Sequence, residues 1–162
     1  MMKRIAALMM ALMMLCGVAL ATEPDATTSA STVDHYAATA LTGDELMNAI
    51  NSFSGTYLVG TTNPDGTANV AYFIFSIVEH EGVRYLQLGL AENQSKANLL
   101  ANPKGVAVYA ANPVEGAMPY SVSGARIWFD AIEDEALIET LRTNYAYPTT
   151  LFFNIVEVRP LG

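Results

Sequence analysis

The sequence predicts a mainly β protein built as a closed antiparallel barrel. Six segments show the alternating or continuously apolar pattern of strands, and turn residues separate them. The segments differ in length, and only two or three short helices interrupt them. The chain lacks the regular alternation of strand and helix that a parallel sheet requires. We therefore expect antiparallel strands that close on one another.

The first 21 residues are typical of a secretory signal peptide. Lys3 and Arg4 precede an apolar, Met-rich run, and Ala19-Leu20-Ala21 is a small-x-small cleavage site. The apolar run is shorter than the roughly 20 residues of a membrane span, and no basic cluster follows it. We expect an exported protein, periplasmic or extracellular, with no stable membrane insertion once residues 1–21 are removed.

Cysteine content and charge narrow the class of protein. Cys16 would leave with the signal peptide, so the mature chain has no thiol for a disulfide, a nucleophile or a zinc site. A lipoprotein is disfavoured, since Leu15 stands where lipidation needs a small residue. The formal net charge is −8, and losing Lys3 and Arg4 would make it −10, which opposes nucleic-acid binding. A small molecule or a redox partner is the expected ligand.

Residues 22–40 are predicted to be a flexible tether, because they are rich in Ala, Thr and Ser and have no apolar period. His35 lies in this tether and His80 in a turn, so the two histidines give no metal-ligand spacing. We expect no metal site. The remaining residues, 41–162, are predicted to form one domain.

The domain is predicted to open with a short helix and a hairpin. Residues 42–45, Thr-Gly-Asp-Glu, match a capping box with Thr42 as N-cap, ahead of apolar residues at helical spacing. Strands over 56–62 and 67–79 then flank an Asn-Pro-Asp-Gly turn. The second strand is apolar on both faces through Tyr72, Phe73, Ile74 and Phe75, so we expect it at the centre of the fold.

Four further strands are predicted, over residues 83–90, 105–111, 120–131 and 150–160. Gly124 is expected to mark a bulge or bend in the third of these. A short helix from Ser95 to Ala101 ends before Asn102-Pro103, because proline disfavours helical geometry in the preceding residue. A last helix, Asp134 to Asn144, has acidic residues in its first turn and Arg142 in its last, as the helix dipole favours.

The helix at Ser95 is the best candidate for a binding site. With Ser95 as N-cap, the backbone N–H groups of Lys96, Ala97 and Asn98 are expected to be free to bind an anion. Gln94 and Asn98 can donate further bonds from their side chains, and Lys96 adds a positive charge. The alternative is a well-capped surface helix with no ligand.

The order of these parts resembles a known family. An Asp-Gly hairpin, an apolar strand, Y-L-Q-L-G-L and then S-K-A-N-L-L-A-N-P-K-G-V-A-V follow one another at the spacing of the FMN-binding split barrels. These belong to the pyridoxamine 5'-phosphate oxidase-like superfamily. The resemblance covers roughly residues 45 to 160, and it looks nearest to the small stand-alone FMN-binding proteins of that group.

The resemblance implies a six-stranded antiparallel split β-barrel with two or three short helices, which forms a homodimer with two FMN molecules in clefts between the protomers. It places the phosphate on Gln94, Ser95 and Asn98, with Lys96 nearby. It places the flavin ring along one strand, with two aromatic walls contributed across the dimer. The ring-binding residues are Ala71, Tyr72, Phe73 and Ile74, and the walls are Tyr120 and Trp128.

The resemblance implies an exported FMN-binding protein, a flavin-dependent oxidoreductase or electron carrier acting on a small molecule or redox partner. No general acid or base is evident, so whether the protein is an enzyme is left open. The alternative is a non-enzymatic dimeric binding module of the same fold. Such a module would bind another flat ligand, such as haem or a different flavin, or would have no cofactor.

Overall fold

The computed structural model describes residues 36–112, 121–145 and 150–162, all within one unit, Val33–Gly162. The predicted signal peptide and most of the predicted tether lie outside these residues. The last five residues assigned to the tether are structured, since Ala37–Thr39 form a short 3₁₀ helix, η1, and Ala40 bridges Gly124. None of the described helices is long and apolar enough to span a membrane.

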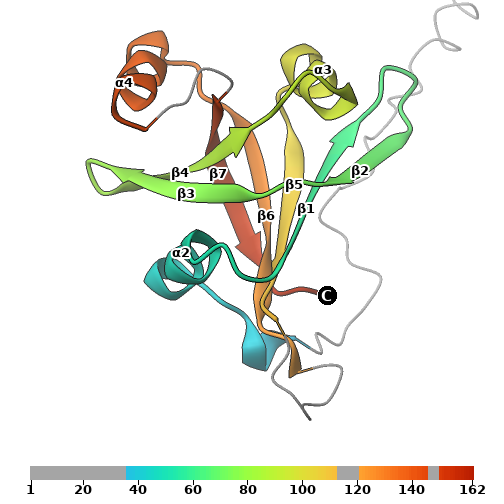
Figure 1. Cartoon of the computed structure of the whole chain (residues 1–162), viewed down its shortest axis with the longest axis vertical. Coiled ribbons are helices and arrows are strands. Elements are labelled where there is room, and N and C mark those ends of the chain that lie inside the picture. Colours follow the sequence, from blue (N-terminus) through green and yellow to red (C-terminus); the bar gives the residue numbers. More distant parts are fainter. Residues whose placement is uncertain (1–35, 113–120, 146–149) are drawn as a thin grey trace, which may run out of the picture. The chain divides into compact units, whose positions relative to one another are not determined.

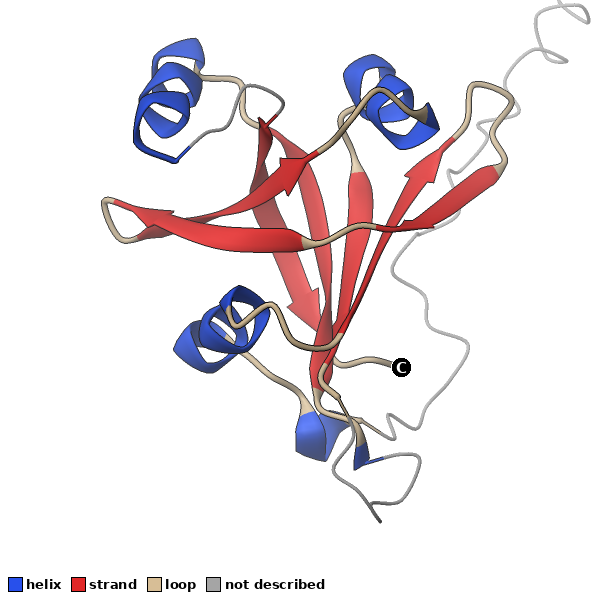
Figure 2. Cartoon of the chain, in the orientation of Figure 1, coloured by secondary structure: helices blue, strands red, loops and turns tan. Residues whose placement is uncertain are grey.

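Seven strands form one antiparallel sheet, in the order β2-β1-β5-β6-β7-β4-β3 (Figures 1 and 2). The predicted closure of the barrel is wrong, because within the described residues no ladder joins the edge strands β2 and β3. The strands are β1 (Thr56–Thr62), β2 (Ala68–Tyr72), β3 (Phe75–His80), β4 (Val83–Gly89), β5 (Gly105–Ala110), β6 (Gly124–Ala131) and β7 (Thr150–Arg159).

The structure has seven strands where six were predicted, because the segment predicted as one strand over 67–79 forms two strands, β2 and β3. This segment is divided at residues 73–74. It pairs with β1 up to Tyr72 and with β4 from Phe75 onward, so residues 73–74 carry the chain between the two edges of the sheet. The predicted central position is therefore wrong. Alternation continues through the break, since Phe75 is 1% exposed whereas Tyr72 and Ile74 are 58% and 50% exposed. The apolar run has one inner face and one outer face.

The predicted Asn-Pro-Asp-Gly turn is confirmed, whereas His80, which was predicted to lie in a turn, is the last residue of β3. In the β1–β2 turn the Gly66 N–H donates to the Asn63 oxygen at 2.9 Å, and Gly66 has a φ of +84°, which favours glycine. The β3–β4 turn consists of Glu81 and Gly82, whose φ angles of +51° and +78° suit a two-residue hairpin. A bulge or bend was predicted at Gly124, but β6 begins at this residue. The register of β6 with β7 instead shifts between Trp128 and Phe129.

Three α-helices accompany the sheet: α2 (Gly43–Asn51), α3 (Gln94–Ala101) and α4 (Glu135–Tyr145). Helix α2 begins after Thr42, as predicted, but the Thr42 side chain makes no capping bond. In α4 the Asp134 carboxylate caps the helix, accepting from the N–H groups of Ala136 and Leu137 at 2.9 and 3.2 Å. Figure 1 shows α2 and α3 at opposite ends of β1, β5 and β6.

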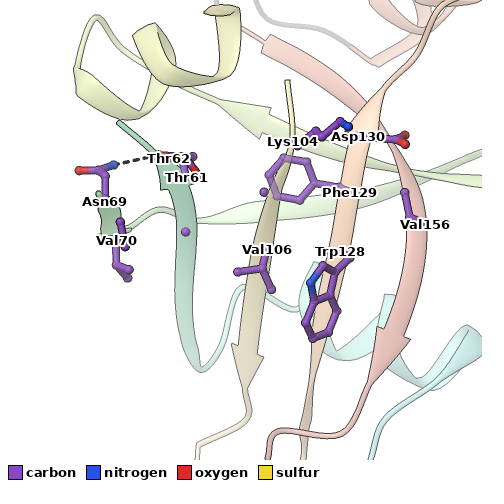
Figure 3. A pocket seen from close by; sticks show the side chains of 13 residues that line it. Thr61, Thr62, Asn69, Val70, Lys104, Val106, Trp128, Phe129, Asp130 and Val156 are labelled. Atoms are coloured by element: carbon purple, nitrogen blue, oxygen red, sulfur yellow. Dashed lines mark hydrogen bonds between the residues drawn. The ribbon is translucent and has the colours of Figure 1, made fainter. Parts of the chain in front are cut away.

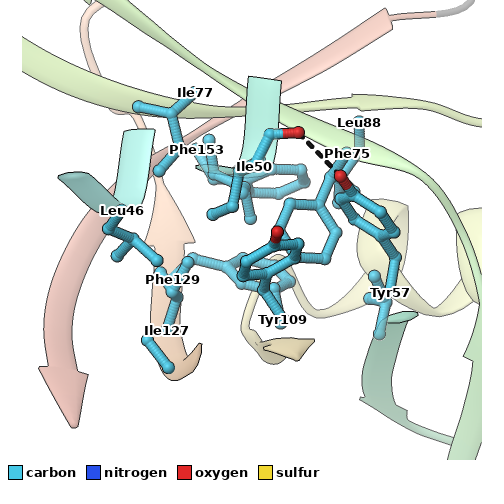
Figure 4. Packing of buried hydrophobic residues seen from close by; sticks show 14 of the residues in the cluster. Leu46, Ile50, Tyr57, Phe75, Ile77, Leu88, Tyr109, Ile127, Phe129 and Phe153 are labelled. Carbon is cyan, nitrogen blue, oxygen red and sulfur yellow. Dashed lines mark hydrogen bonds between the residues drawn. The ribbon is translucent and has the colours of Figure 1, made fainter. Parts of the chain in front are cut away.

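The main core lies on the inner face of the sheet, between α2 and α3 (Figure 4). Tyr57, Phe75 and Tyr109 meet there, with the Tyr57 ring centroid 5.2 Å from each of the other two. The tyrosine hydroxyls bond to the C-terminal end of α2: Tyr57 donates to the Ile50 oxygen at 2.7 Å, and Tyr109 to the Ala49 oxygen at 3.1 Å. Burial raises the pKa of both tyrosines.

A second, smaller core holds α4 against the outer side of β4 and β7. Leu141 is fully buried among Tyr85, Ile132 and Phe152, and Leu137 and Ile138 of α4 pack against this cluster. The three helices thus cover the inner face and the outer side of β4 and β7. The outer face of β2, β1, β5 and β6 retains exposed apolar side chains, and the site lies on it.

Candidate functional site

A cleft of about 540 Å³ lies across the outer face of the sheet, over β2, β1, β5, β6 and β7 (Figure 3). Its middle is apolar and comes from four strands, with Val70, Val106, Trp128 and Val156. Alternation along each strand places these residues opposite the core positions. Val70 and Val156 are 65% and 60% exposed. The volume and the apolar lining are those of a small-molecule site.

One end of the cleft is polar. Lys104 and Asp130 lie there, and Figure 3 shows both at the end away from Trp128. Gly105, the first residue of β5, pairs with Phe129, so the same register places Lys104, which precedes β5, opposite Asp130 of β6. Within the described residues neither side chain has a hydrogen-bond or ion-pair partner. The cleft thus offers one cation and one anion side by side.

Two arginines lie beside Trp128, a predicted wall of the flavin site. The Arg126 guanidinium is 5.5 Å and the Arg159 guanidinium 5.0 Å from the centre of the Trp128 ring, within cation–π range. Arg159 is also paired with Glu157 at 2.6 Å, and this bond raises the pKa of the guanidinium. These contacts fix the indole at the apolar part of the cleft.

The cleft continues into a network of side chains that links the sheet to α3. Asn69 and Thr61 line the cleft, and the Asn69 amide donates to the Ser95 hydroxyl at 2.9 Å and to the Thr61 hydroxyl at 3.0 Å. The Asn98 amide donates to Thr61 at 3.1 Å and to the Asn63 carbonyl at 2.9 Å. Ser95 and Asn98 are each only 2% exposed. These two residues therefore join the cleft through Thr61 and Asn69.

The predicted N-cap of α3 is wrong. The cap is Asn93, whose side-chain oxygen accepts from the Lys96 N–H at 2.9 Å, while the Asn93 backbone oxygen accepts from Ala97 at 3.1 Å. Asn is as good a cap as Ser, and Asn93 stands two residues before Ser95 in the chain. The helix therefore starts after Asn93, and Ser95 lies inside its first turn. The N–H groups of Lys96 and Ala97 are thus already bonded, and the predicted anion-binding set does not form there.

The two remaining predicted phosphate ligands lie at the surface of α3. Gln94 is exposed and donates to the Asn98 side-chain oxygen at 2.7 Å, which completes the network. Lys96 forms an ion pair with Glu92, one turn earlier. Among the described lysines and arginines, only Lys104 and Arg126 have no carboxylate partner within 4.0 Å.

The predicted ring-binding residues follow β2 and its continuation. Tyr72 and Ile74 are exposed, and Ala71 and Phe73 are half-buried. β2 is an edge strand, so its backbone groups that face away from β1 have no ladder partner. Of the two predicted walls, Trp128 lines the cleft, and Tyr120 lies outside the described residues. The part of the chain that the structure describes holds no cluster of His, Cys, Asp and Glu able to bind a metal ion.

Sequence reasoning missed four of the residues that line the cleft, namely Thr61, Asn69, Lys104 and Asp130. Thr61 and Asn69 lie within the strands predicted over 56–62 and 67–79, and neither strand by itself indicates a contact with the helix predicted at residues 95–101. The one available signal was Asn69 in an otherwise apolar strand. Lys104 and Asp130 are 26 positions apart in number, and only the pairing of β5 with β6 brings them together.

No family model and no curated protein matches the chain. Among solved structures it is similar to an FMN-binding protein from Syntrophomonas wolfei subsp. wolfei, with 16% identity, 74% of this chain and 85% of the other covered, and a TM-score of 0.52. The chain has the split-barrel fold. The fold expected from the family resemblance is confirmed in part, because seven strands form an open sheet where a six-stranded barrel was expected.

Two further split-barrel structures are more distant. HupZ from Group A Streptococcus has 14% identity and a TM-score of 0.49, over 75% of this chain and 94% of that one. Flavoredoxin of Desulfovibrio vulgaris (Miyazaki F) has 10% identity and a TM-score of 0.43, over 66% and 69%.

Proposed function

We propose that this protein binds FMN in the outer-face cleft and uses it to carry electrons or to reduce a small molecule. The observation that carries the proposal is the connection between the cleft and the buried Ser95 and Asn98 through Thr61 and Asn69. The cleft volume is within the range of cofactor sites, and its apolar middle suits a flat ring. The FMN-binding protein from Syntrophomonas wolfei supports the proposal through its shared fold.

FMN would supply the redox chemistry, and the protein would bind and orient it. Val70, Val106 and Trp128 would cover the ring and exclude water. The hydroxyl and amide groups around Ser95 and Asn98 would hold the polar chain of the cofactor, each able to exchange a bond within the network for one to the ligand. Among the residues that the structure describes, Lys104 and Asp130 are the only titratable groups that line the cleft, so substrate protonation is left to these two or to water.

We also propose that the protein is a homodimer. Val70, Tyr72 and Val156 are at least 58% exposed on a sheet face that none of α2, α3 and α4 covers. A second protomer on this face would bury these apolar side chains and enclose the cleft. Export to the periplasm or the exterior belongs to the same proposal, and it is supported by the charged start, apolar run and small-x-small site of residues 1–21.

The test is retention of FMN by the purified protein. After mixing with FMN and gel filtration, the protein should be yellow, elute as a dimer and show a raised melting temperature. The double variant Ser95→Ala with Asn98→Ala should lose the cofactor, whereas Arg142→Met on the surface of α4 should retain it. A colourless protein that shows no melting shift with FMN would instead indicate a binding module for another ligand.

A further inference from the structure

The polar end of the cleft has a chemistry that the proposed function leaves unused. Oppositely charged side chains that face each other across neighbouring strands can bond to each other, as Arg84 and Glu79 do at 3.1 Å between β3 and β4. Lys104, which directly precedes β5, lies opposite Asp130 of β6 in the same register but makes no such bond, and both residues line the cleft. Their nitrogen and oxygen atoms are thus available to a ligand.

These two groups differ in what they can bond. The Lys104 ammonium only donates hydrogen bonds, and the ionised Asp130 carboxylate only accepts them. A ligand that bridges both must present an acceptor and a donor side by side. The carboxylate would repel a phosphate group, so the anionic end of a cofactor is disfavoured at this position. The apolar residues beside the pair add the requirement that the ligand be flat and largely uncharged there.

We infer that Lys104 and Asp130 bind the pyrimidinedione edge of the flavin ring through hydrogen bonds. That edge presents two carbonyl oxygens on either side of the N3–H, so Asp130 would accept from N3–H and Lys104 would donate to a neighbouring carbonyl. This inference rests on the proposed flavin binding and adds the ligand class: flavins and deazaflavins share this edge, whereas haem lacks it. The phosphate end of FMN is then directed away from Lys104.

The pair has a second consequence for the bound ring. Reduction of a flavin places negative charge on the pyrimidine part of the ring, and a cation beside it stabilises that charge. Lys104 therefore raises the reduction potential of the bound flavin, and Asp130 lowers it. The two residues set the potential together, through their distances from the same edge.

The test compares riboflavin with N3-methylriboflavin on the full-length protein. Wild-type protein should bind riboflavin at least about tenfold more tightly, since methylation removes one hydrogen bond to a charged group. Asp130→Leu should weaken riboflavin binding and abolish the difference between the two flavins. Lys104→Met should weaken both flavins and lower the midpoint potential of bound FMN. The controls Arg142→Met and Glu139→Leu remove one cation and one anion from α4 and should change nothing.

Equal binding of riboflavin and N3-methylriboflavin by the wild-type protein would overturn the inference without any variant having to fold. If FMN still binds in a manner that needs Ser95 and Asn98, the proposed function survives that result. If neither FMN nor riboflavin binds, both proposals fail. A midpoint potential that is unchanged in Lys104→Met would show that the ammonium does not face the ring.

Discussion

Asn51 holds both backbone groups of Ile77. The Asn51 amide donates to the Ile77 oxygen at 2.8 Å, and the Ile77 N–H donates to the Asn51 side-chain oxygen at 2.9 Å. The side chain at the end of α2 thus occupies the place of a missing strand beside β3, which is an edge strand. The Asn51 amide makes the two hydrogen bonds that a neighbouring strand would make, so another chain cannot pair with β3 at Ile77.

We expect Asn51→Ala to lower the free energy of unfolding by about 1–2 kcal/mol, because two hydrogen bonds of a partly buried edge are lost. The same variant should aggregate faster when concentrated. Urea unfolding and light scattering measure the two effects. Asn48→Ala, on an exposed position of the same helix, is the matched control and should behave like the wild type. Equal losses in both variants would contradict the assignment of the effect to the two bonds with Ile77, because alanine favours a helix more than asparagine does.

Removal of Asn98 should cost more than a surface contact does. Its side chain is 2% exposed and bonds Thr61, Asn63 and Gln94 at 2.7–3.1 Å. Asn98→Ala leaves the buried Thr61 hydroxyl with one partner fewer, so we expect a loss of about 2–3 kcal/mol in denaturant unfolding. Leu100→Ala, at a 65% exposed position of the same helix, should cost far less.

Gly124 cannot accept a side chain. A Cβ at this position would lie 2.1 Å from the Tyr109 backbone oxygen, in the ladder between β5 and β6. Gly124→Ala should therefore separate these strands and cost about 3 kcal/mol. Gly89→Ala is the control, because a Cβ there meets nothing within 4 Å. Thermal unfolding of the two variants side by side measures the difference, and similar melting temperatures would contradict the close approach.

The buried tyrosines predict a loss of stability in alkali. Burial raises the pKa of Tyr57 and Tyr109 above the ordinary value of 10.0 in the folded protein. Between the unfolded and the folded pKa the unfolded chain binds fewer protons, so the free energy of unfolding falls as the pH rises. This contribution is complete below pH 10.0 and is lost as the pH rises through the folded pKa.

Urea unfolding at a series of alkaline pH values measures this slope. Tyr57→Phe should be less stable at neutral pH, because the Ile50 oxygen loses its donor. It should also show a shallower decline in alkali, because one of the two shifted groups is gone. A slope that equals that of the wild type would mean that Tyr57 ionises as freely in the folded protein as in the unfolded chain.

The local structure of this chain follows from residues that are close together in the sequence. The Asp-Gly and Glu-Gly turns, the start of α2 after Thr42 and the end of α3 before Pro103 depend on residues only a few positions apart. Such signals act within one turn of chain and survive in almost any surroundings. The error at the start of α3 has the same scale, since Asn93 and Ser95 are both good caps and packing favoured the first.

Which segments lie side by side depends on contacts between residues that are far apart in the sequence. The apolar run from Tyr72 to Phe75 fits one central strand as well as two edge strands. The alternation of apolar residues shows which face of the sheet each side chain is on, but not which strands lie next to it. The partner of Ser95, Asn69, comes from β2, and the register of β5 with β6 places Lys104 opposite Asp130. These contacts join residues 26 or more positions apart, and the shared burial of the inner face fixes them.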